Sequence, residues 1–368
     1  MNAAVPFLAL GPQVAELRPE IDAAIARVLS SGWYLLGKEL ESFEAEWAAY
    51  CEAPHAVGLA NGLDAIRLAL EAVGVQPGDE VLVPSHTYIA SWLGVLQCGA
   101  KPVPVECDPA TMNMDPARLA AALTGRTRAV LPVHLYGQPA DLDPILAFAR
   151  ANKLAVVEDA AQCHGARYRG RRIGAHGDAV CWSFYPTKNL GALGDAGAVT
   201  TTRADIADRL RVMRNYGQRT RYVCEQIGLN SRMEELHAAV LRVKLAHLDA
   251  WNGRRVKQAE RYLRELVGLP GLTLPTIPTG TEPVWHLFVV QHAQRDAVQR
   301  KLTERGVQSI AHYPVPCHRQ QALRHLHIPA GSLPVAERLA AQVLSLPCGP
   351  HLSDEQQTQV IAAVRAAC

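Results

Sequence analysis

The sequence has no apolar run long enough to cross a membrane, because no stretch approaches the roughly 20 consecutive apolar residues that a bilayer requires. It also lacks a strong charge of one sign: 37 Lys and Arg residues stand against 35 Asp and Glu residues, which gives a net charge of +2. No polybasic tract stands out along the chain. These absences argue against a membrane or a nucleic acid as a partner.

Metal-binding and disulfide patterns are missing as well. The nine cysteines form no CxxC pair and no short-spaced framework. Several of them lie in apolar runs, such as Cys181 in AVCWSF. This usage is typical of reduced, buried thiols, so we expect a cytoplasmic protein with neither disulfides nor a metal site.

The chain has 368 residues, of which 49% are hydrophobic, and this length suits about two globular domains. Continuous β-branched runs predict strands buried on both faces, as in a parallel sheet covered by helices. The runs are EVLVP (80–84), PVPV (102–105), AVLPV (129–133), LAVVED (154–159) and AVCWSF (179–184). Helical segments are expected between them, around 63–73, 88–99, 115–123 and 143–152. This order predicts an α/β domain with a mostly parallel central sheet.

The texture of the sequence changes after a long helical stretch at about 234–266. The segment 268–283 is rich in Pro and Gly and breaks any helix. A strand at 285–291 and helices near 294–305, 335–345 and 353–366 are expected to follow. We therefore predict a large domain over 1–245, including an N-terminal helical segment, and a smaller C-terminal α+β domain over 246–368.

The most informative segment runs from 156 to 198, where Asp159 and Ser183 end two strands and Lys188 follows in a Gly-rich stretch. In open α/β sheets, ligands bind beyond the carboxyl ends of the strands. A lysine amine can form a Schiff base with pyridoxal phosphate (PLP), and a buried carboxylate keeps the pyridine nitrogen of that cofactor protonated. Gln162 is placed to contact the ring oxygen. On spacing alone, however, Lys188 also fits a surface loop, and Asp159 also fits a helix N-cap.

A second candidate element is VGLANGLDAIRLAL (57–70), in which a strand is followed by Asn61-Gly62 and then a helix. Free N–H groups at such a helix start bind phosphate, although an ordinary turn has the same pattern. Tyr88 follows the strand at 80–84 and is a candidate to stack on a planar ring. Core packing is the alternative for an aromatic residue there.

Two further segments carry candidate binding residues. Arginines at 214, 219, 221 and 232 suit a diphosphate, although solvated surface charge is the better explanation for any single one of them. His312 and Tyr313 lie beside two prolines that stiffen the loop, which fits either a site wall or a purely structural turn.

Taken together, the segments resemble the DegT/DnrJ/EryC1/StrS family of sugar aminotransferases over nearly the whole chain. The resemblance rests on ordered motifs: ANGLDAIRLAL, PSHTYIAS, PVHLYGQPADLDPI, VEDAAQCHGA, SFYPTKNLGALGDAGAV, LNSRMEELHAAVLRVKL, HYPVPCH and LSLPCGPHLSDEQ. It implies the PLP-dependent transferase fold of the aspartate aminotransferase type I and a homodimer with shared active sites. PLP is the implied cofactor.

The resemblance also implies roles for single residues. Lys188 corresponds to the Schiff-base lysine, Asp159 to the partner of the pyridinium nitrogen, and Gln162 to the contact of the ring oxygen. Tyr88 corresponds to the residue that stacks on the ring. Phosphate contacts are implied for Gly62, Leu63, Ser183 and, from the neighbouring subunit, Asn230.

Within the family, SFYPTKNLGALGDAGA and the HYPVPCH loop resemble the branch that makes dTDP-3-amino-3,6-dideoxyhexoses from 3-keto sugars. L-glutamate is then the implied amino donor. Tyr185, His312 and Tyr313 are expected near the sugar, and Arg219 near the diphosphate. An enzyme that acts at C4 or on a UDP-sugar remains an alternative, as does a non-catalytic regulatory protein.

Two other enzyme classes fit less well. In related PLP-dependent dehydratases a histidine can replace the lysine, whereas this chain has Lys188. The segment LGALGDAG is glycine-rich but is not the GxGxxG of a Rossmann dehydrogenase.

Overall fold

The computed structural model describes residues 4–368, so the first three residues of the predicted large domain lie outside the described residues. Its centre is a seven-stranded sheet with the order β1-β9-β8-β5-β4-β2-β3. The strands are β1 (His55–Leu59), β2 (Glu80–Pro84), β3 (Lys101–Val105), β4 (Thr127–Val130), β5 (Ala155–Asp159), β8 (Ala179–Ser183) and β9 (Gly197–Thr201). β9 runs antiparallel to both of its neighbours, and the other adjacent pairs are parallel.

The expected mostly parallel sheet is therefore confirmed, with two differences from the sequence prediction. β9 was not predicted, although all five of its residues are buried. The strand predicted over 129–133 ends at Val130 in β4, because Pro132 has no N–H group to donate to a neighbouring strand. The carbonyl of Pro132 still accepts a hydrogen bond from the N–H of Asp159 (2.9 Å).

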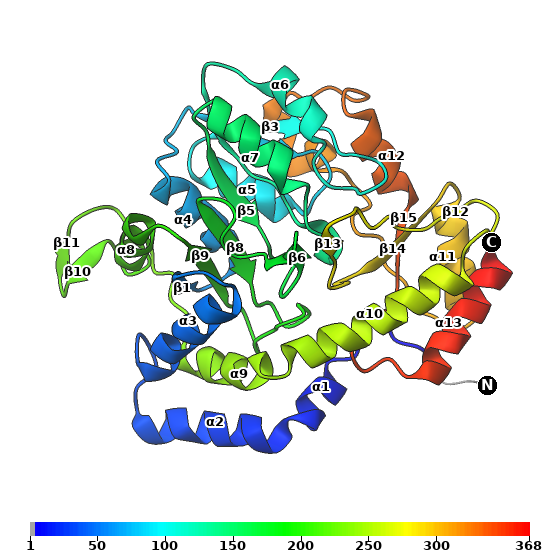
Figure 1. Cartoon of the computed structure of the whole chain (residues 1–368), viewed down its shortest axis with the longest axis horizontal. Helices are drawn as coiled ribbons and strands as arrows, with labels where there is room; N and C mark the ends of the chain where they lie inside the picture. Colours follow the sequence, from blue (N-terminus) through cyan, green and yellow to red (C-terminus); the bar gives the residue numbers. More distant parts are fainter. Residues whose placement is uncertain (1–3) are drawn as a thin grey trace.

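Helices cover both faces of this sheet (Figure 1). One face carries α4 (Gly62–Ala72), α5 (Ile89–Gln97) and α8 (Ala204–Met213). The other face carries α3 (Lys38–Tyr50), α6 (Leu119–Ala122), α7 (Leu142–Ala151) and α9 (Glu235–Leu245). Alternate residues of β8 show the division, because Cys181 packs with the first group of helices and Trp182 with the second.

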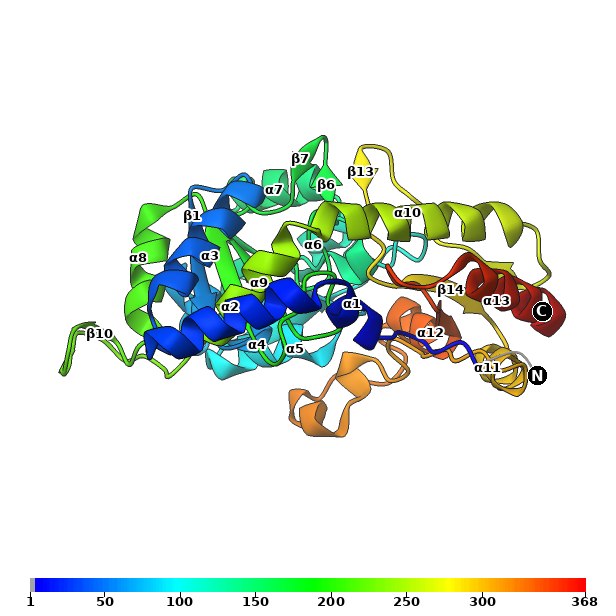
Figure 2. The ribbon, with the colours of Figure 1, turned by 90° about the horizontal axis from the view of Figure 1, so that it is seen from below.

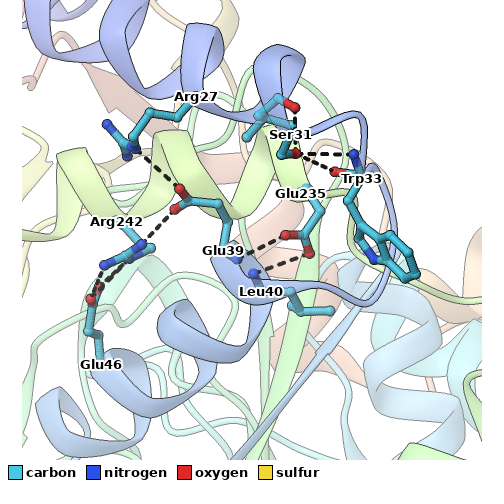
Figure 3. Close-up of polar contacts among 9 residues, drawn as sticks. Arg27, Ser31, Trp33, Glu39, Leu40, Glu46, Glu235 and Arg242 are labelled. Carbon is cyan, nitrogen blue, oxygen red and sulfur yellow. Dashed lines mark hydrogen bonds and ion pairs between the residues drawn. The ribbon is translucent and has the colours of Figure 1, made fainter.

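The start of α3 is held by a carboxylate from another helix (Figure 3). The N-cap residue of α3, Gly37, has no side chain for capping. The buried carboxylate of Glu235 takes its place by accepting hydrogen bonds from the backbone N–H groups of Gly37 (2.8 Å), Glu39 (2.9 Å) and Leu40 (3.3 Å). Arg242, which lies about two turns further along the same face of α9, pairs with Glu39 and Glu46. These contacts fix α3 against α9.

The C-terminal part has its own core, built on a three-stranded antiparallel sheet in the order β12-β14-β15. Its elements are α10 (Leu248–Glu265), β12 (Leu272–Thr273), β14 (Phe288–His292), α11 (Arg295–Glu304), α12 (Pro334–Gln342), β15 (Val343–Leu346) and α13 (Asp354–Ala367). Val5 also packs in this core, where it pairs with Val307. The N-terminal segment thus packs against the C-terminal part of the molecule.

Three C-terminal predictions differ from the structure in detail. The helical stretch expected at 234–266 is two helices, α9 and α10, which are separated at 246–247. The strand expected at 285–291 begins only at Phe288, because the preceding residues bond to the turn at Tyr136 and Gly137. The helix expected at 335–345 ends at Gln342, where β15 begins.

The remaining elements are short or peripheral. The helices are α1 (Gly11–Glu16), α2 (Arg18–Ser31) and the 3-10 turns η1 (Pro116–Arg118), η2 (Leu135–Gly137), η3 (Cys317–Arg319) and η4 (Gln321–Leu326). The strands are β6 (Arg167–Tyr168), β7 (Arg171–Arg172), β10 (Gln218–Thr220), β11 (Val223–Cys224) and β13 (Thr281–Glu282). The β10–β11 hairpin projects from the end of the molecule opposite α13 in both views (Figure 1 and Figure 2).

The composition led to expectations about the cysteines and about membrane-spanning helices, and the structure describes both. All nine cysteines are free, and seven of them are buried, whereas Cys224 is exposed and Cys368 is half-buried. Over residues 4–368, none of the helices combines the length and the apolar character that crossing a bilayer demands.

Candidate active site

A pocket of about 610 Å³ opens beyond the carboxyl ends of β2, β4, β5 and β8. This is the position at which parallel α/β sheets bind ligands. Ten of the residues predicted for the site line this pocket: Gly62, Leu63, Tyr88, Asp159, Gln162, Ser183, Tyr185, Lys188, His312 and Tyr313. The fold thus brings together residues that are far apart in the sequence.

Lys188 lies in the turn that follows β8, where its backbone N–H donates to the carbonyl of Tyr185 (2.8 Å). Burial lowers the pKa of the Lys188 amine to about 8, and the charge of Asp159 opposes part of this shift. A lysine with this pKa is about one-tenth neutral at pH 7, far more than an ordinary lysine with its pKa of about 10.4. The neutral amine is the form that attacks an aldehyde or accepts a proton.

The carboxylate of Asp159 is fixed by two hydrogen bonds at the end of β5. The hydroxyl of Ser91 donates to its Oδ2 (2.7 Å), and the N–H of Ala161 donates to its Oδ1 (3.1 Å). The side chain is buried, with 6% of the residue exposed. A fixed, buried carboxylate of this kind favours a positive charge on a ring nitrogen that it contacts.

The start of α4 forms a close-fitting cup against β8. The side chain of Asn61 caps the helix by accepting from the N–H of Asp64 (2.8 Å). A Cβ atom on Gly62 would lie 2.6 Å from the Cβ of Ser183, so only glycine permits this approach. The first N–H groups of a helix have no partner within the helix and attract anions. The cup therefore suits a phosphate group.

Gln162 is held by the walls of the pocket through both ends of its amide. Its Oε1 accepts from the N–H of Tyr136 (2.6 Å), and its Nε2 donates to the hydroxyl of Tyr313 (3.1 Å). An amide nitrogen has two hydrogens, so one remains for a ligand. Tyr136 itself has φ +62 and donates from its hydroxyl to the carbonyl of His312. The turn at Tyr136 thus ties the His312–Tyr313 loop to the segment that follows β4.

Aromatic and histidine side chains form the rim of the pocket. The rings of Tyr88 and Tyr313 lie 5.2 Å apart at an angle of 37°. Tyr88 is 53% exposed and Tyr185 is 51% exposed, so both have free ring surface at the mouth. Burial and the charge of Lys188 lower the pKa of His312 to about 4, which leaves this imidazole neutral near neutral pH.

Two of the predicted residues do not line this pocket. Arg219 lies exposed on β10 and pairs with Asp208 (2.7 Å) and Glu225 (3.5 Å). Asn230 is exposed and forms a bridge with Asn215. Neither residue reaches the pocket of its own chain, so their roles remain predictions that require a second subunit.

Several lining residues were missed by the sequence analysis, including His286, Asp195 and Thr87. His286 was placed only within a predicted strand of the small domain. No local pattern could have marked it as a site residue, because it reaches the pocket through the packing of the C-terminal part of the chain against the turn at Tyr136 and Gly137. Ser91, which orients Asp159, was hidden in the same way within an apolar helix.

The chemistry of the pocket fits PLP. The close approach of Gly62 to Ser183 leaves a cup for a phosphate, Asp159 offers a buried carboxylate, and Lys188 offers an amine. The exposed ring of Tyr88, which lines the pocket, suits stacking on a planar ring. Among residues 4–368, no cluster of three or more His, Cys, Asp or Glu side chains is arranged to hold a metal ion.

Comparison with known proteins gives close relatives over nearly the whole chain. The dTDP-3-amino-3,4,6-trideoxy-alpha-D-glucose transaminase of Streptomyces venezuelae is 58% identical, over 98% of this chain and 95% of that protein. The erythromycin biosynthesis sensory transduction protein EryC1 of Saccharopolyspora erythraea is 56% identical, over 98% and 99%. The dTDP-3-amino-3,6-dideoxy-alpha-D-galactopyranose transaminase of Aneurinibacillus thermoaerophilus is 46% identical, over 98% of each chain.

Solved structures agree with these relatives. The crystal structure of S. venezuelae DesV in complex with a ketimine intermediate has a TM-score of 0.98 at 57% identity, over 99% of this chain and 98% of that chain. NtdA of Bacillus subtilis with bound cofactor PMP has a TM-score of 0.92 at 31% identity, over 100% and 86%. The expected PLP-dependent transferase fold is confirmed by these matches. The sequence pattern of one family matches residues 15–365. The chain therefore belongs to the DegT/DnrJ/EryC1/StrS aminotransferase family.

Proposed function

We propose that this protein transfers an amino group from L-glutamate to the 3-keto group of a dTDP-linked 6-deoxyhexose, with PLP as its cofactor. The observation that carries the proposal is the pocket in which Lys188 and Asp159 lie together beyond the ends of β5 and β8. The printed names of the relatives at 58% and 46% identity, both transaminases of dTDP-3-amino sugars, support the choice of substrate.

The residues of this chain would hold PLP in a definite way. Lys188 would bind its aldehyde, Asp159 its ring nitrogen and Gln162 its ring oxygen. Its phosphate would occupy the cup formed by Gly62, Leu63 and Ser183, and its ring would stack on Tyr88. When bound, PLP withdraws electrons from the carbon that bears the amino group and so makes the hydrogen on that carbon acidic.

The protein supplies the proton transfers and the orientation. The neutral Lys188 amine, whose pKa is about 8, accepts a proton at Nζ and returns it at a neighbouring carbon. Asp159, held by Ser91 and Ala161, keeps a positive charge in place on the opposite side of the site. The same residues serve both halves of the transfer, first with the amino acid and then with the sugar.

The rim of the pocket would bind the sugar. Tyr185, His312 and Tyr313 line the mouth and present hydroxyl and imidazole groups that can bond to hydroxyls of a hexose. His312 donates or accepts there as a neutral group, because its pKa is lowered to about 4. Its Nδ1 lies 2.8 Å from the Oγ of Ser345, which leaves Nε2 for the ligand.

We also propose the two-domain division at 245–246 and a homodimer with shared active sites. Arg219 and Asn230 lie outside their own pocket, and the same part of the chain exposes apolar side chains, with Tyr222 80% and Ile227 92% exposed. A second subunit that covers these side chains would bring Arg219 to the diphosphate and Asn230 to the phosphate of its partner's site.

The direct test is incubation of the protein with PLP, L-glutamate and a panel of dTDP- and UDP-linked 3-keto and 4-keto sugars, followed by mass analysis. An amino sugar from the dTDP-linked 3-keto compounds is expected. A product formed only from 4-keto or UDP-linked sugars would overturn the substrate assignment. Lys188→Ala should abolish both turnover and the visible absorbance of the bound cofactor, and the absence of both in the unaltered protein would favour a regulatory role.

A further inference from the structure

His286 is a buried residue at the pocket to which the proposed mechanism gives no role. It lies two residues before β14, it is 7% exposed, and it lines the pocket together with Lys188. Its position depends on two close contacts of the backbone. A Cβ atom on Gly137 would lie 2.7 Å from the N of His286, and Arg255 donates to the His286 carbonyl (3.3 Å). The backbone at His286 is therefore held in a fixed place.

A chain of hydrogen bonds determines which ring nitrogen carries the proton. The Nδ2 of Asn189 donates to the carbonyl of Val284 (3.0 Å) and to the Oδ1 of Asn252 (2.8 Å). Asn252 is oriented in turn, because its Nδ2 donates to the carbonyl of His164 (2.8 Å). A backbone carbonyl can only accept, so both amides have one orientation.

It follows that Asn189 turns its Oδ1 towards His286, whose Nδ1 lies 3.1 Å away. An amide oxygen only accepts, so Nδ1 of His286 must carry the proton and donate it. In a neutral imidazole with a protonated Nδ1, the lone pair resides on Nε2. The residue that directly follows Lys188 thus fixes the tautomer of His286.

The electrostatic surroundings keep this imidazole neutral. Burial, followed by the charges of Lys188 and Arg255, holds the pKa of His286 well below its usual range, and His164 and His312 are its histidine neighbours. The two histidines among these neighbours are themselves neutral near neutral pH, since burial lowers the pKa of His164 to about 3 and that of His312 to about 4. The charge of Asp159 raises the pKa of Lys188 and so opposes part of the effect of burial.

We infer that His286 is a positioning residue for Lys188. Both residues line one pocket, and the Nε2 of His286 is the acceptor for Nζ of Lys188 when the amine turns towards His286. The bond directs the remaining hydrogen and the lone pair of the neutral Nζ into the pocket. Asn189 maintains this function by fixing the tautomer. The inference rests on the proposed function, because it assigns a role in the proton transfers of the same site.

A first test uses the cofactor-free protein. Nitrogen NMR of His286 should show a protonated Nδ1 and an unprotonated Nε2, and Asn189→Ala should convert this into a mixture of tautomers. The rate of PLP uptake should rise with pH as Lys188 becomes neutral, and its midpoint should move to lower pH in His286→Phe, because the ammonium form loses an acceptor. An unchanged midpoint, or a protonated Nε2, would overturn the inference.

A second test follows the half-reaction with glutamate in the protein loaded with PLP. His286→Phe should slow the exchange of the glutamate α-hydrogen with deuterated solvent by about 10- to 100-fold, the effect of one lost hydrogen bond to a charged group. His286→Gln should recover part of this loss, because the amide can also donate to Asn189 and accept from Lys188. His292→Phe, at a histidine outside the pocket, is the matched control and should leave the rate unchanged.

A double-mutant comparison separates positioning from simple packing. Asn189→Ala should slow the exchange in the unaltered protein and add little to the loss in His286→Phe, because the two residues act through one hydrogen bond. Fully additive losses would contradict the inference. If the unaltered protein exchanges no glutamate hydrogen at all, the proposed function fails; if it does and His286→Phe exchanges equally fast, only the role of His286 fails.

Discussion

The hydroxyl of Ser91 donates a 2.7 Å hydrogen bond to Oδ2 of Asp159, which links the first turn of α5 to the end of β5. Ser91 is fully buried, and its Oγ also lies 3.0 Å from that of Thr87. The contact fixes the carboxylate that is proposed to face the cofactor ring. The acid at the strand end therefore depends on a helix that begins some 70 residues earlier in the chain.

Ser91→Ala should weaken PLP binding by about tenfold, because loss of one buried hydrogen bond to a charged group costs roughly 1.5–3 kcal/mol and the carboxylate can partly recover a bond to water. The visible absorbance of the bound cofactor, titrated with PLP, gives the dissociation constant. Ser332→Ala, at an exposed serine in the loop before α12, is the control. An equal affinity in Ser91→Ala would show that Ala161 alone suffices to orient Asp159.

Gly62→Ala should largely abolish PLP binding while the protein still folds. The added Cβ would lie 2.6 Å from the Cβ of Ser183, so the start of α4 must move away from β8 and the phosphate cup must open. Equilibrium dialysis with PLP measures the loss of PLP binding. Free inorganic phosphate should bind to the cup of the unaltered protein but not to that of the variant. Gly253→Ala is the control, because a Cβ atom at that position in α10 would meet nothing within 4 Å.

The pH dependence of PLP uptake by the cofactor-free protein should report the pKa of Lys188. Below about pH 8 the amine is protonated and cannot attack the aldehyde, and above it the neutral form predominates. The uptake rate should therefore rise with pH to a plateau, with its midpoint near pH 8. Stopped-flow absorbance measures the rate. A midpoint near the usual lysine value of about 10.4 would mean that burial does not lower the pKa of this amine.

Glu235→Ala should destabilise the protein by about 1–3 kcal/mol, because the buried N–H groups at the start of α3 would lose their acceptor (Figure 3). Urea unfolding measures the change in the free energy of unfolding. The free energy of unfolding of Glu235→Gln should lie between those of Glu235→Ala and the unaltered protein, since the amide oxygen still accepts a hydrogen bond. Glu41→Ala, at an exposed residue in the same first turn, should have a much smaller effect; equal losses in Glu41→Ala and Glu235→Ala would contradict the capping role.

The sequence could predict the parallel strands because strands buried on both faces form continuous apolar runs, as β2 and β8 do. It could also predict that Asp159 and Lys188 lie near each other. Asp159 ends one strand and Lys188 follows another, and the carboxyl ends of these parallel strands lie at the same edge of the sheet. The antiparallel direction of β9 leaves no mark in its sequence, GAVTT. Likewise, His286 and Ser91 reach the site only through long-range packing, which no local pattern records.

The proposed sharing of active sites between two subunits makes a distinct prediction for mixed dimers. Lys188→Ala and Arg219→Ala should each lose most of their activity, the first through the cofactor and the second through the diphosphate of the sugar nucleotide. If Arg219 serves the partner's site, a dimer with one copy of each variant has one pocket with both defects and one pocket that is intact.

Co-expression of Lys188→Ala with Arg219→Ala should therefore restore part of the activity, measured as amino sugar formed from the keto sugar. If Arg219 instead served its own pocket, each site of the mixed dimer would carry one defect and no activity would return. A mixture of Lys188→Ala with Asp159→Asn is the control. Both residues line the same pocket of one chain, so each site of that mixed dimer carries one of the two defects and neither site is intact. Recovery in the first mixture and none in the control would assign Arg219 to the neighbouring subunit.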